Sequence, residues 1–374
     1  MRRLVVASHP ALINGKEYDG IGNAVVEALS TEQLTYYFVR HSMNGNAPSR
    51  IDTYQAGEVV ASNKLPVISR PSPLRYISEM FATVWHFTFR KKVDTFVAID
   101  PLNACAAVFL KKLGRIETCI FLTPDYSPQR FSSKQLNNIY HGIDRFCVRN
   151  ADEVWSVSTR IQEVRRKMGL EDAKNILLPN VPPAKFANLR KNSHDKYNLV
   201  TTGIIDKQLD FEGTIRAVAQ LKGAYPKLSF TVVGNGPEED RLKLLAKELH
   251  VADRVHFMGR RPLAETLELQ SKAGIGLALY TGEWAFNHFG DSTKCREFFF
   301  FGLPVISTDS HATVPEIKQF KPGLVVEKGV EYYTEAITDI IENYDTYAKA
   351  SRKLGDAYDD VHRKNILRVL EPTK

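Results

Sequence analysis

The chain has 374 residues, of which 43% are hydrophobic and 25% are charged, with a formal net charge of +7. This length is typical of two α/β domains, and the apolar fraction is sufficient to build a core in each of them. We find no apolar run of about 18 residues that would predict a membrane-spanning helix. The four cysteines (Cys105, Cys119, Cys147, Cys295) show no zinc-binding or disulfide spacing, which fits a reducing cytosol.

The basic excess belongs to the N-terminal half. Residues 1–190 contain 25 Lys and Arg against 17 Asp and Glu, whereas residues 191–374 contain 25 against 26. Two interpretations remain open: an ordinary solvated surface, or a face turned toward an anionic membrane or a pyrophosphate-bearing acceptor. Nucleic acid is a poorer fit, because no basic cluster interleaves with aromatic residues in a known module.

Short β-branched runs alternate with helical stretches along the first half, which predicts a parallel sheet covered by helices. The expected strands are 4–8, 36–41, 95–100, 118–123, 153–158 and 176–179. The expected helices lie near 22–30, 74–90, 103–113, 134–150 and 159–168.

A second α/β pattern follows a polar, proline-bearing segment at 180–197. Its expected strands are 198–202, 229–233, 255–258, 274–280, 304–308 and 324–327, and its expected helices lie near 210–223, 237–249, 263–273, 293–301 and 331–349. We therefore predict an N-terminal Rossmann-like domain (1–187), a linker (188–197), a C-terminal Rossmann-like domain (198–352) and a final helical segment (353–374).

The most informative segment is 287–309. Gly290 closes a loop, Ser292 and Thr293 are typical of a helix start, and Lys294 and Glu297 stand one turn apart on that helix. Amide groups at a helix start can meet an anion, and such a lysine and glutamate suit a phosphate and a sugar hydroxyl. The pattern resembles the nucleotide-sugar site of GT-B glycosyltransferases, especially the retaining family 4.

The resemblance implies a donor site in the C-terminal domain and a final helix that crosses back to the first domain. It assigns donor binding to the following residues: Gly20, Gly22, Gly203, Lys207, Gly234, Gly290, Ser292, Thr293, Lys294 and Glu297. Gly20 and Gly22 are expected in a loop after the first strand. The family's Gly-Arg pair is Gly203-Ile204 here, and Phe289 replaces the first glutamate of its E-x7-E motif, so a cation and an acid are missing.

Residues 121–131 end a predicted strand on the acceptor side of such enzymes. The resemblance implies that Asp125 orients or deprotonates an acceptor hydroxyl, with Tyr126 and Arg130 beside it; an Asx-turn cap is the alternative interpretation of Asp125. We expect Asp125, Lys207 and Glu297 to be the catalytic residues.

Residues 70–92 combine aromatic bulk with basic ends. They are interpreted either as an ordinary packing helix, which we favour, or as an amphipathic helix on a membrane.

Together these features predict a cytoplasmic retaining glycosyltransferase that uses a nucleotide-diphosphate sugar, with UDP- or GDP-sugars as the first choices. The expected acceptor is a glycan or a lipid-linked glycan, with peripheral contact to an anionic membrane and no metal or other cofactor. The alternatives are a catalytically silent nucleotide-binding scaffold and a sugar epimerase. A phosphorylase and a Rossmann oxidoreductase fit less well, because their cofactor signatures are absent from the sequence.

Overall fold

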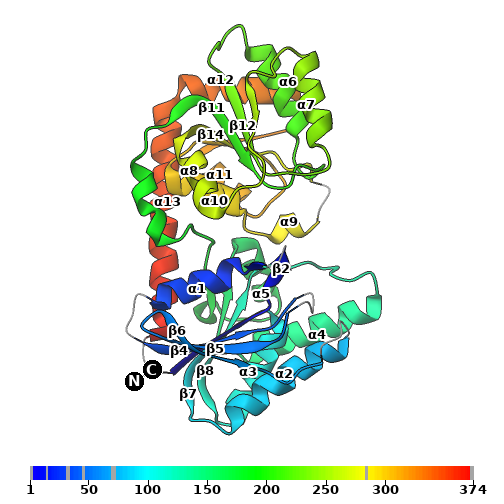
Figure 1. Ribbon diagram of the computed structural model, residues 1–374, viewed down its shortest axis with the longest axis vertical. Coiled ribbons are helices and arrows are strands. Elements are labelled where there is room, and N and C mark those ends of the chain that lie inside the picture. The colour runs from blue at the N-terminus through cyan, green and yellow to red at the C-terminus, as the bar shows by residue number, and fades with distance from the viewer. Residues whose placement is uncertain are drawn as a thin grey trace. The chain divides into compact units, whose positions relative to one another are not determined.

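The computed structural model describes residues 3–13, 16–30, 34–43, 47–68, 73–282 and 285–370. The chain divides into two compact units: Met1–Pro179 with Val361–Lys374, and Asn180–Asp360. Each unit is built on a sheet that is parallel except for one edge of the first, with helices packed on its faces (Figure 1). The predicted fold class is confirmed.

The first unit is built on a sheet with the strand order β10-β9-β8-β7-β1-β4-β5-β6. The strands are β1 (Arg3–Ser8), β4 (Thr35–Arg40), β5 (Arg50–Gln55), β6 (Glu58–Lys64), β7 (Val93–Ile99), β8 (Ile116–Thr123), β9 (Glu153–Ser156) and β10 (Asn175–Leu177). From β10 to β4 the pairing is parallel, and β5 and β6 add an antiparallel edge. The central strands are continuous buried apolar runs, as parallel strands covered on both faces require.

Besides the end of the chain's last long helix, the described elements of this unit include five helices and two short 3-10 turns: α1 (Gly20–Ser30), α2 (Pro73–Thr88), α3 (Pro101–Lys112), α4 (Lys134–Asn150), α5 (Thr159–Lys167), η1 (Asp172–Lys174) and η3 (Arg368–Leu370). Side-chain caps fix several of their starts. Asp100 accepts from the amides of Leu102 and Asn103 at the start of α3, and Ser158 accepts from that of Ile161 in α5.

The edge of this sheet was not predicted. Strands β5 and β6 form a hairpin around Ala56 and Gly57, which both have positive φ, as two-residue hairpin turns need. Every residue of β6 is exposed, so the strand lacks the alternation of buried apolar and exposed polar residues by which sequence analysis finds strands. A small antiparallel pair, β2 (Ala11–Ile13) and β3 (Lys16–Tyr18), also went unpredicted.

Gly20 and Gly22 do not lie in a loop, so that expectation was wrong. They form the first turn of α1, and β2 and β3 precede them. The Asp19 carboxylate accepts from the Gly22 amide (Oδ1 to N, 2.9 Å) and so caps the helix. A Cβ at Gly22 would lie 2.1 Å from this carboxylate, so glycine is needed there for packing.

The second unit contains a parallel sheet with the order β13-β12-β11-β14-β15-β16. The strands are β11 (Asp195–Thr202), β12 (Ser229–Val233), β13 (Val255–Phe257), β14 (Ala273–Ala278), β15 (Val305–Thr308) and β16 (Gly323–Val326). The helices are η2 (Ala184–Lys191), α6 (Phe211–Leu221), α7 (Glu239–Glu248), α8 (Leu263–Lys272), α9 (Ala285–Phe289), α10 (Thr293–Phe301), α11 (Val314–Phe320), α12 (Val330–Glu342) and α13 (Tyr344–Leu367). One core cluster centres on Leu199, Phe230 and Ile275, and another on Phe298 to Phe301.

Two boundaries differ from the prediction. The unit boundary falls between Pro179 and Asn180, and the expected linker 188–197 lies inside the second unit as η2 and the start of β11. The single helix expected at 331–349 is interrupted at Asn343, where α12 ends and α13 follows.

The end of α13 belongs to the first unit. His362 bonds the Pro179 carbonyl through Nδ1 (2.7 Å), Asn365 donates to the Leu177 carbonyl (2.7 Å), and both contacts anchor the helix near β10. The chain therefore returns to the first unit from Val361 onward, compared with the predicted boundary at 353. Residues 371–374 of the predicted final segment lie outside the described residues.

Candidate functional site: a cavity at the start of α10

A cavity of about 450 Å³ opens at the carboxyl end of the second unit's sheet, where ligands of open α/β sheets bind. The end of β11, the residues after β14 and the start of α10 surround it. It is lined by Thr202, Gly203, Tyr280, Asn287, Gly290, Asp291, Ser292, Thr293, Lys294, Glu297 and His311. The segment that the sequence singled out is therefore brought together with Gly203 in one cavity.

The start of α10 presents backbone amides to this cavity. Ser292 caps the helix: its hydroxyl accepts from the amide of Cys295 (3.4 Å), and its own amide donates to Thr313 Oγ1 (3.2 Å). Among the described residues, no acceptor is found for the amides of Thr293 and Lys294, which belong to the first turn. Together with the helix dipole, these amides favour an anion at this end of α10.

Lys294 supplies a positive charge at the same place. Its Nζ lies 4.3 Å from the centroid of the Tyr280 ring, a cation–π contact that holds the side chain over the cavity. A Cβ built on Gly203 would lie 3.9 Å from this Nζ, so the lysine reaches the end of β11. The hydroxyl of Tyr280 bonds Ser292 Oγ (3.1 Å), which ties the ring to the helix cap.

Glu297 is buried at the base of the cavity, one turn after Lys294. Gln270 of α8 donates to its carboxylate (Nε2 to Oε2, 2.6 Å). Burial raises the pKa of Glu297 to about 7, while the hydrogen bond from Gln270 and the charge of Lys294 act in the opposite direction. A buried carboxylate with spare acceptor capacity is suited to a pair of ligand hydroxyl groups. Sequence analysis did not find Gln270, because nothing local marks a partner 27 residues upstream.

A buried ion network supports the helix start from behind. Arg296 donates to Asp291 (Nε to Oδ1, 2.7 Å) and pairs with Glu316 (NH2 to Oε2, 2.9 Å). Asp291 also accepts from the backbone amide of Asn180 (2.8 Å). These groups are almost fully buried, and Arg296 pairs with both carboxylates, so the network fixes the loop that carries Gly290 and Ser292.

Gly234 has a packing role. A Cβ on Gly234, whose φ is +151°, would lie 1.8 Å from the carbonyl oxygen of Gly203. The two loops can approach only without side chains there, and this approach fixes the end of β11 beside the cavity. Gly234 does not line the cavity itself.

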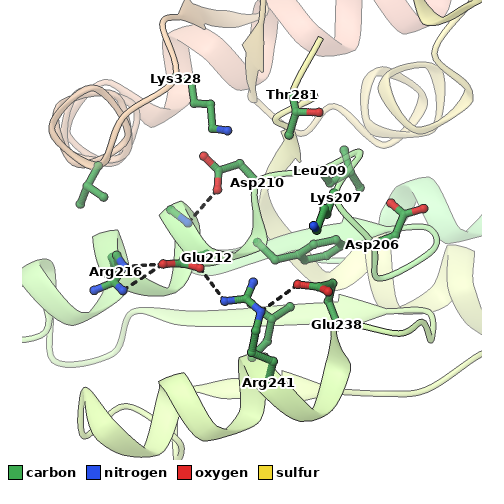
Figure 2. A pocket seen from close by; sticks show the side chains of 14 residues that line it. Asp206, Lys207, Leu209, Asp210, Glu212, Arg216, Glu238, Arg241, Thr281 and Lys328 are labelled. Carbon is green, nitrogen blue, oxygen red and sulfur yellow. Dashed lines mark hydrogen bonds and ion pairs between the residues drawn. The ribbon is translucent and has the colours of Figure 1, made fainter. Parts of the chain in front are cut away.

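Lys207 is not brought together with Lys294 and Glu297. It lines a separate cavity of about 410 Å³ in the second unit, which Figure 2 shows. Four of the charged residues there pair with one another: Glu212 accepts from Arg216 (2.9 Å) and Arg241 (2.6 Å), and Arg241 also donates to Glu238 (2.8 Å). The role predicted for Lys207 stays a prediction.

The predicted acceptor residues lie on the loop after β8, at the carboxyl edge of the first unit's sheet. Asp125 pairs with Arg130 (Oδ1 to NH1, 2.9 Å), and the guanidinium of Arg130 lies 5.0 Å from the centroid of the Tyr140 ring. The ring of Tyr126 lies 5.7 Å from that of His141. Asp125 is exposed, and its ion pair orients it toward its own loop.

A buried charged cluster on this same sheet edge was missed by sequence analysis. Strands β1 and β7 pair with Ala7 opposite Ala98, so His9 and Asp100 follow their strands side by side. His9 contacts Asp100 (Nδ1 to Oδ2, 2.5 Å) and Glu79 (Nε2 to Oε2, 3.2 Å). Burial disfavours the imidazolium, but these two carboxylates raise the pKa of His9 to about 10.

Asp100 is under backbone strain in this cluster. Its φ is +78°, which is uncommon for a residue with a side chain and is often found at functional sites. Burial opposes its ionisation, but the charge of His9 prevails and the pKa of Asp100 is lowered. The first unit therefore holds an ionised, partly exposed carboxylate at the ligand-binding edge of its sheet. The sequence signal for this charged cluster was a polar residue directly after each of two strands that pair in parallel.

The family model described as glycosyl transferases group 1 matches residues 184–355. The match spans most of the second unit. The lipopolysaccharide core biosynthesis glycosyltransferase LpsD of Rhizobium meliloti is 32% identical over 104 residues, covering 28% of this chain and 29% of LpsD. An uncharacterized glycosyltransferase of Haemophilus influenzae is 23% identical over 193 residues, covering 48% and 47%. The chain is thus matched to less than half the length of these relatives.

Solved structures share the whole fold. HepE of Anabaena in complex with UDP has a TM-score of 0.67 at 14% identity and covers 99% of both chains. WaaG, a glycosyltransferase involved in lipopolysaccharide biosynthesis, has a TM-score of 0.60 at 16% identity, covering 98% of this chain and 99% of its own. A Listeria monocytogenes protein assigned as a UDP-N-acetylglucosamine 2-epimerase has a TM-score of 0.62 at 12% identity, covering 98% of this chain and 95% of its own. The protein has the GT-B fold.

Proposed function

We propose that this protein is a retaining glycosyltransferase that moves a sugar from a nucleotide-diphosphate sugar to a hydroxyl of a glycan or lipid-linked acceptor. The observation that carries the proposal is the cavity at α10, where an anion-binding helix start, Lys294 and the buried Glu297 face one ligand-sized space. Its position inside a group 1 glycosyltransferase domain supports the same assignment.

In this proposal the amides of Thr293 and Lys294 and the Lys294 ammonium bind the diphosphate. Glu297 accepts from the ribose hydroxyls, one helical turn further along. Lys207 is proposed as a further cation that assists the leaving diphosphate, since it follows the same strand as Gly203. Cations and helix amides aimed at the leaving group stabilise the charge that develops as the glycosidic bond breaks.

For retention, the bond from the sugar's anomeric carbon to the diphosphate oxygen breaks, and the acceptor oxygen bonds to the same face of that carbon. The acceptor's proton passes to the departing diphosphate oxygen. Asp125, with Tyr126 and Arg130, is proposed to orient the acceptor hydroxyl. No metal is required in this scheme, and the cytosol, which supplies nucleotide sugars, is the proposed place of action.

The proposal is tested by thermal shift with UDP, GDP, ADP and CMP, each with and without magnesium. A ligand at about 100 times its Kd should stabilise the folded protein by about 2.7 kcal/mol. We expect one nucleoside diphosphate to raise the Tm both with and without magnesium. UDP is the first candidate, because HepE was crystallised with it. No shift with any nucleotide would refute the donor site.

Two alternatives are separated by the reaction itself. The likeness to a 2-epimerase makes epimerisation the second candidate. Incubation with UDP-N-acetylglucosamine alone would yield the epimerised sugar nucleotide in that case, whereas a transferase releases free UDP only with acceptor or water. A protein that binds UDP and catalyses neither reaction would be a silent scaffold.

A further inference from the structure

Helix α2 has two faces of different character. One face packs into the first unit through Arg75, Glu79, Thr83 and Phe87, all of them buried. Arg75 and Glu79 form an ion pair on this inner face (Nε to Oε1, 2.8 Å). This face accounts for the packing role that sequence analysis favoured for 70–92, but it does not account for the opposite face.

The opposite face carries large apolar side chains at helical spacing. Leu74, Ile77, Phe81, Trp85 and Phe89 are exposed to 62%, 47%, 65%, 69% and 71%, and we call them the α2 apolar stripe. Their steps of three and four residues place them in one line along the helix. A continuous apolar surface of this kind on a soluble unit indicates an interaction site, because water solvates it poorly.

The stripe ends in a basic segment. Arg90, Lys91 and Lys92 follow Phe89 directly and are exposed. Lys92 contacts Glu117 (Nζ to Oε1, 2.8 Å), an exposed pair that bulk solvent can replace. The acidic residue of α2, Glu79, lies on the inner face, so the outer face of this helix presents no negative charge.

The neighbouring helix also has exposed apolar residues beside a lysine. Helix α3 runs beside α2 (Figure 1) and exposes Phe109 and Leu113, with Lys112 next to them in sequence. An apolar face with cations at its edge is complementary to a bilayer with anionic headgroups: the side chains enter the acyl boundary and the cations remain at the phosphates.

We propose that the α2 apolar stripe docks the first unit on an anionic lipid surface, lying in the interface. Among the described residues, no helix is long and apolar enough to cross a bilayer. The purpose of this docking rests on the proposed function, because a lipid-linked acceptor is held at such a surface. The binding itself can be tested without any sugar donor.

The test is co-sedimentation of the full chain with vesicles of neutral phosphatidylcholine alone or with about one third phosphatidylglycerol. We expect binding to the anionic vesicles that weakens at high ionic strength. Phe81→Ser/Trp85→Ser should lower the partition coefficient by at least about tenfold. Neutralising Arg90, Lys91 and Lys92 to glutamine should lower it by about fivefold for each charge.

The matched control is Leu244→Ser/Leu263→Ser, two exposed leucines of the second unit, which should bind as wild type does. A second readout is quenching of tryptophan fluorescence by brominated lipids. The quenched component should vanish in Trp85→Phe, which keeps an apolar ring at the interface. A thermal shift with UDP on each variant shows separately whether the fold and the donor site are intact.

Absence of wild-type binding to anionic vesicles would overturn the proposal. Equal binding by wild type and Phe81→Ser/Trp85→Ser would also overturn it. If the wild type instead forms dimers that the same double variant dissociates, a second copy of the chain covers the stripe and the lipid assignment is wrong.

Discussion

Replacing Glu297 by glutamine should stabilise the folded protein at neutral and alkaline pH and weaken nucleotide binding. Burial raises the pKa of this carboxyl from 4.5 to about 7. Between pH 4.5 and pH 7 the Glu297 carboxyl is therefore protonated in the folded protein but ionised in the unfolded chain. Stability conferred by that proton is complete below pH 4.5 and is lost as the pH rises through 7.

The pKa difference corresponds to a loss of about 3 kcal/mol, since one unit is worth about 1.4 kcal/mol. Glutamine keeps an acceptor for Gln270 and has no charge to bury, so Glu297→Gln removes this loss. For a unit of this size, 1 kcal/mol is worth roughly 2–4 °C in Tm. We therefore expect Tm to rise by several degrees at pH 8 and to stay nearly unchanged at pH 4.5.

The same substitution should weaken UDP binding by about tenfold or more at pH 8, since a hydrogen bond to a charged acceptor contributes about 1.5–3 kcal/mol. Differential scanning fluorimetry at both pH values and calorimetric titration with UDP measure the two effects. Glu248→Gln, an exposed glutamate of α7, is the control and should change neither. A variant that is less stable than wild type at pH 8, or that binds UDP equally well, would refute the reasoning.

Three further predictions concern other charged groups. Lys294→Ala should weaken UDP binding about 10- to 100-fold, as measured by calorimetry. Lys207→Ala, in the neighbouring cavity, should lower kcat more than it lowers UDP affinity. Unchanged UDP affinity and unchanged kcat in both variants would exclude these lysines as the donor cations. His9→Gln should lower stability at pH 7 by about 3–5 kcal/mol, because it leaves Asp100 without its cation and Glu79 with Arg75 alone. The pKa of His9 is raised from 6.5 to about 10, so the stability that its charge confers is complete below pH 6.5 and is lost as the pH rises through 10. The Tm difference between wild type and His9→Gln should therefore be larger at pH 7 than at pH 10. An equal difference at both pH values would contradict the prediction. Arg296→Met should cost about 3–5 kcal/mol in urea denaturation by leaving Asp291 and Glu316 buried without their cation, and a neutral effect would show that this network does not hold the loop.

The sequence by itself determined the local features of the chain. Apolar runs predicted the central strands of both sheets to within a few residues. The start of α10 followed from Ser292, because capping depends on a hydroxyl at that position, and the helix ends as expected at residue 301, before Gly302 with its left-handed φ of +79°. Lys294 and Glu297 could be assigned to one cavity because their spacing on a helix fixes their relative position.

What depended on long-range contacts was decided by the tertiary structure. The register of β1 against β7 brings His9 to Asp100 across 91 residues, and the packing of α8 on α10 gives Glu297 its partner Gln270. The sequence showed that residues 70–92 combine aromatic bulk with basic ends, but not which side of the helix the sheet covers. Only packing decides that, because a core buries whichever face it meets and leaves Phe81, Trp85 and Phe89 in contact with solvent.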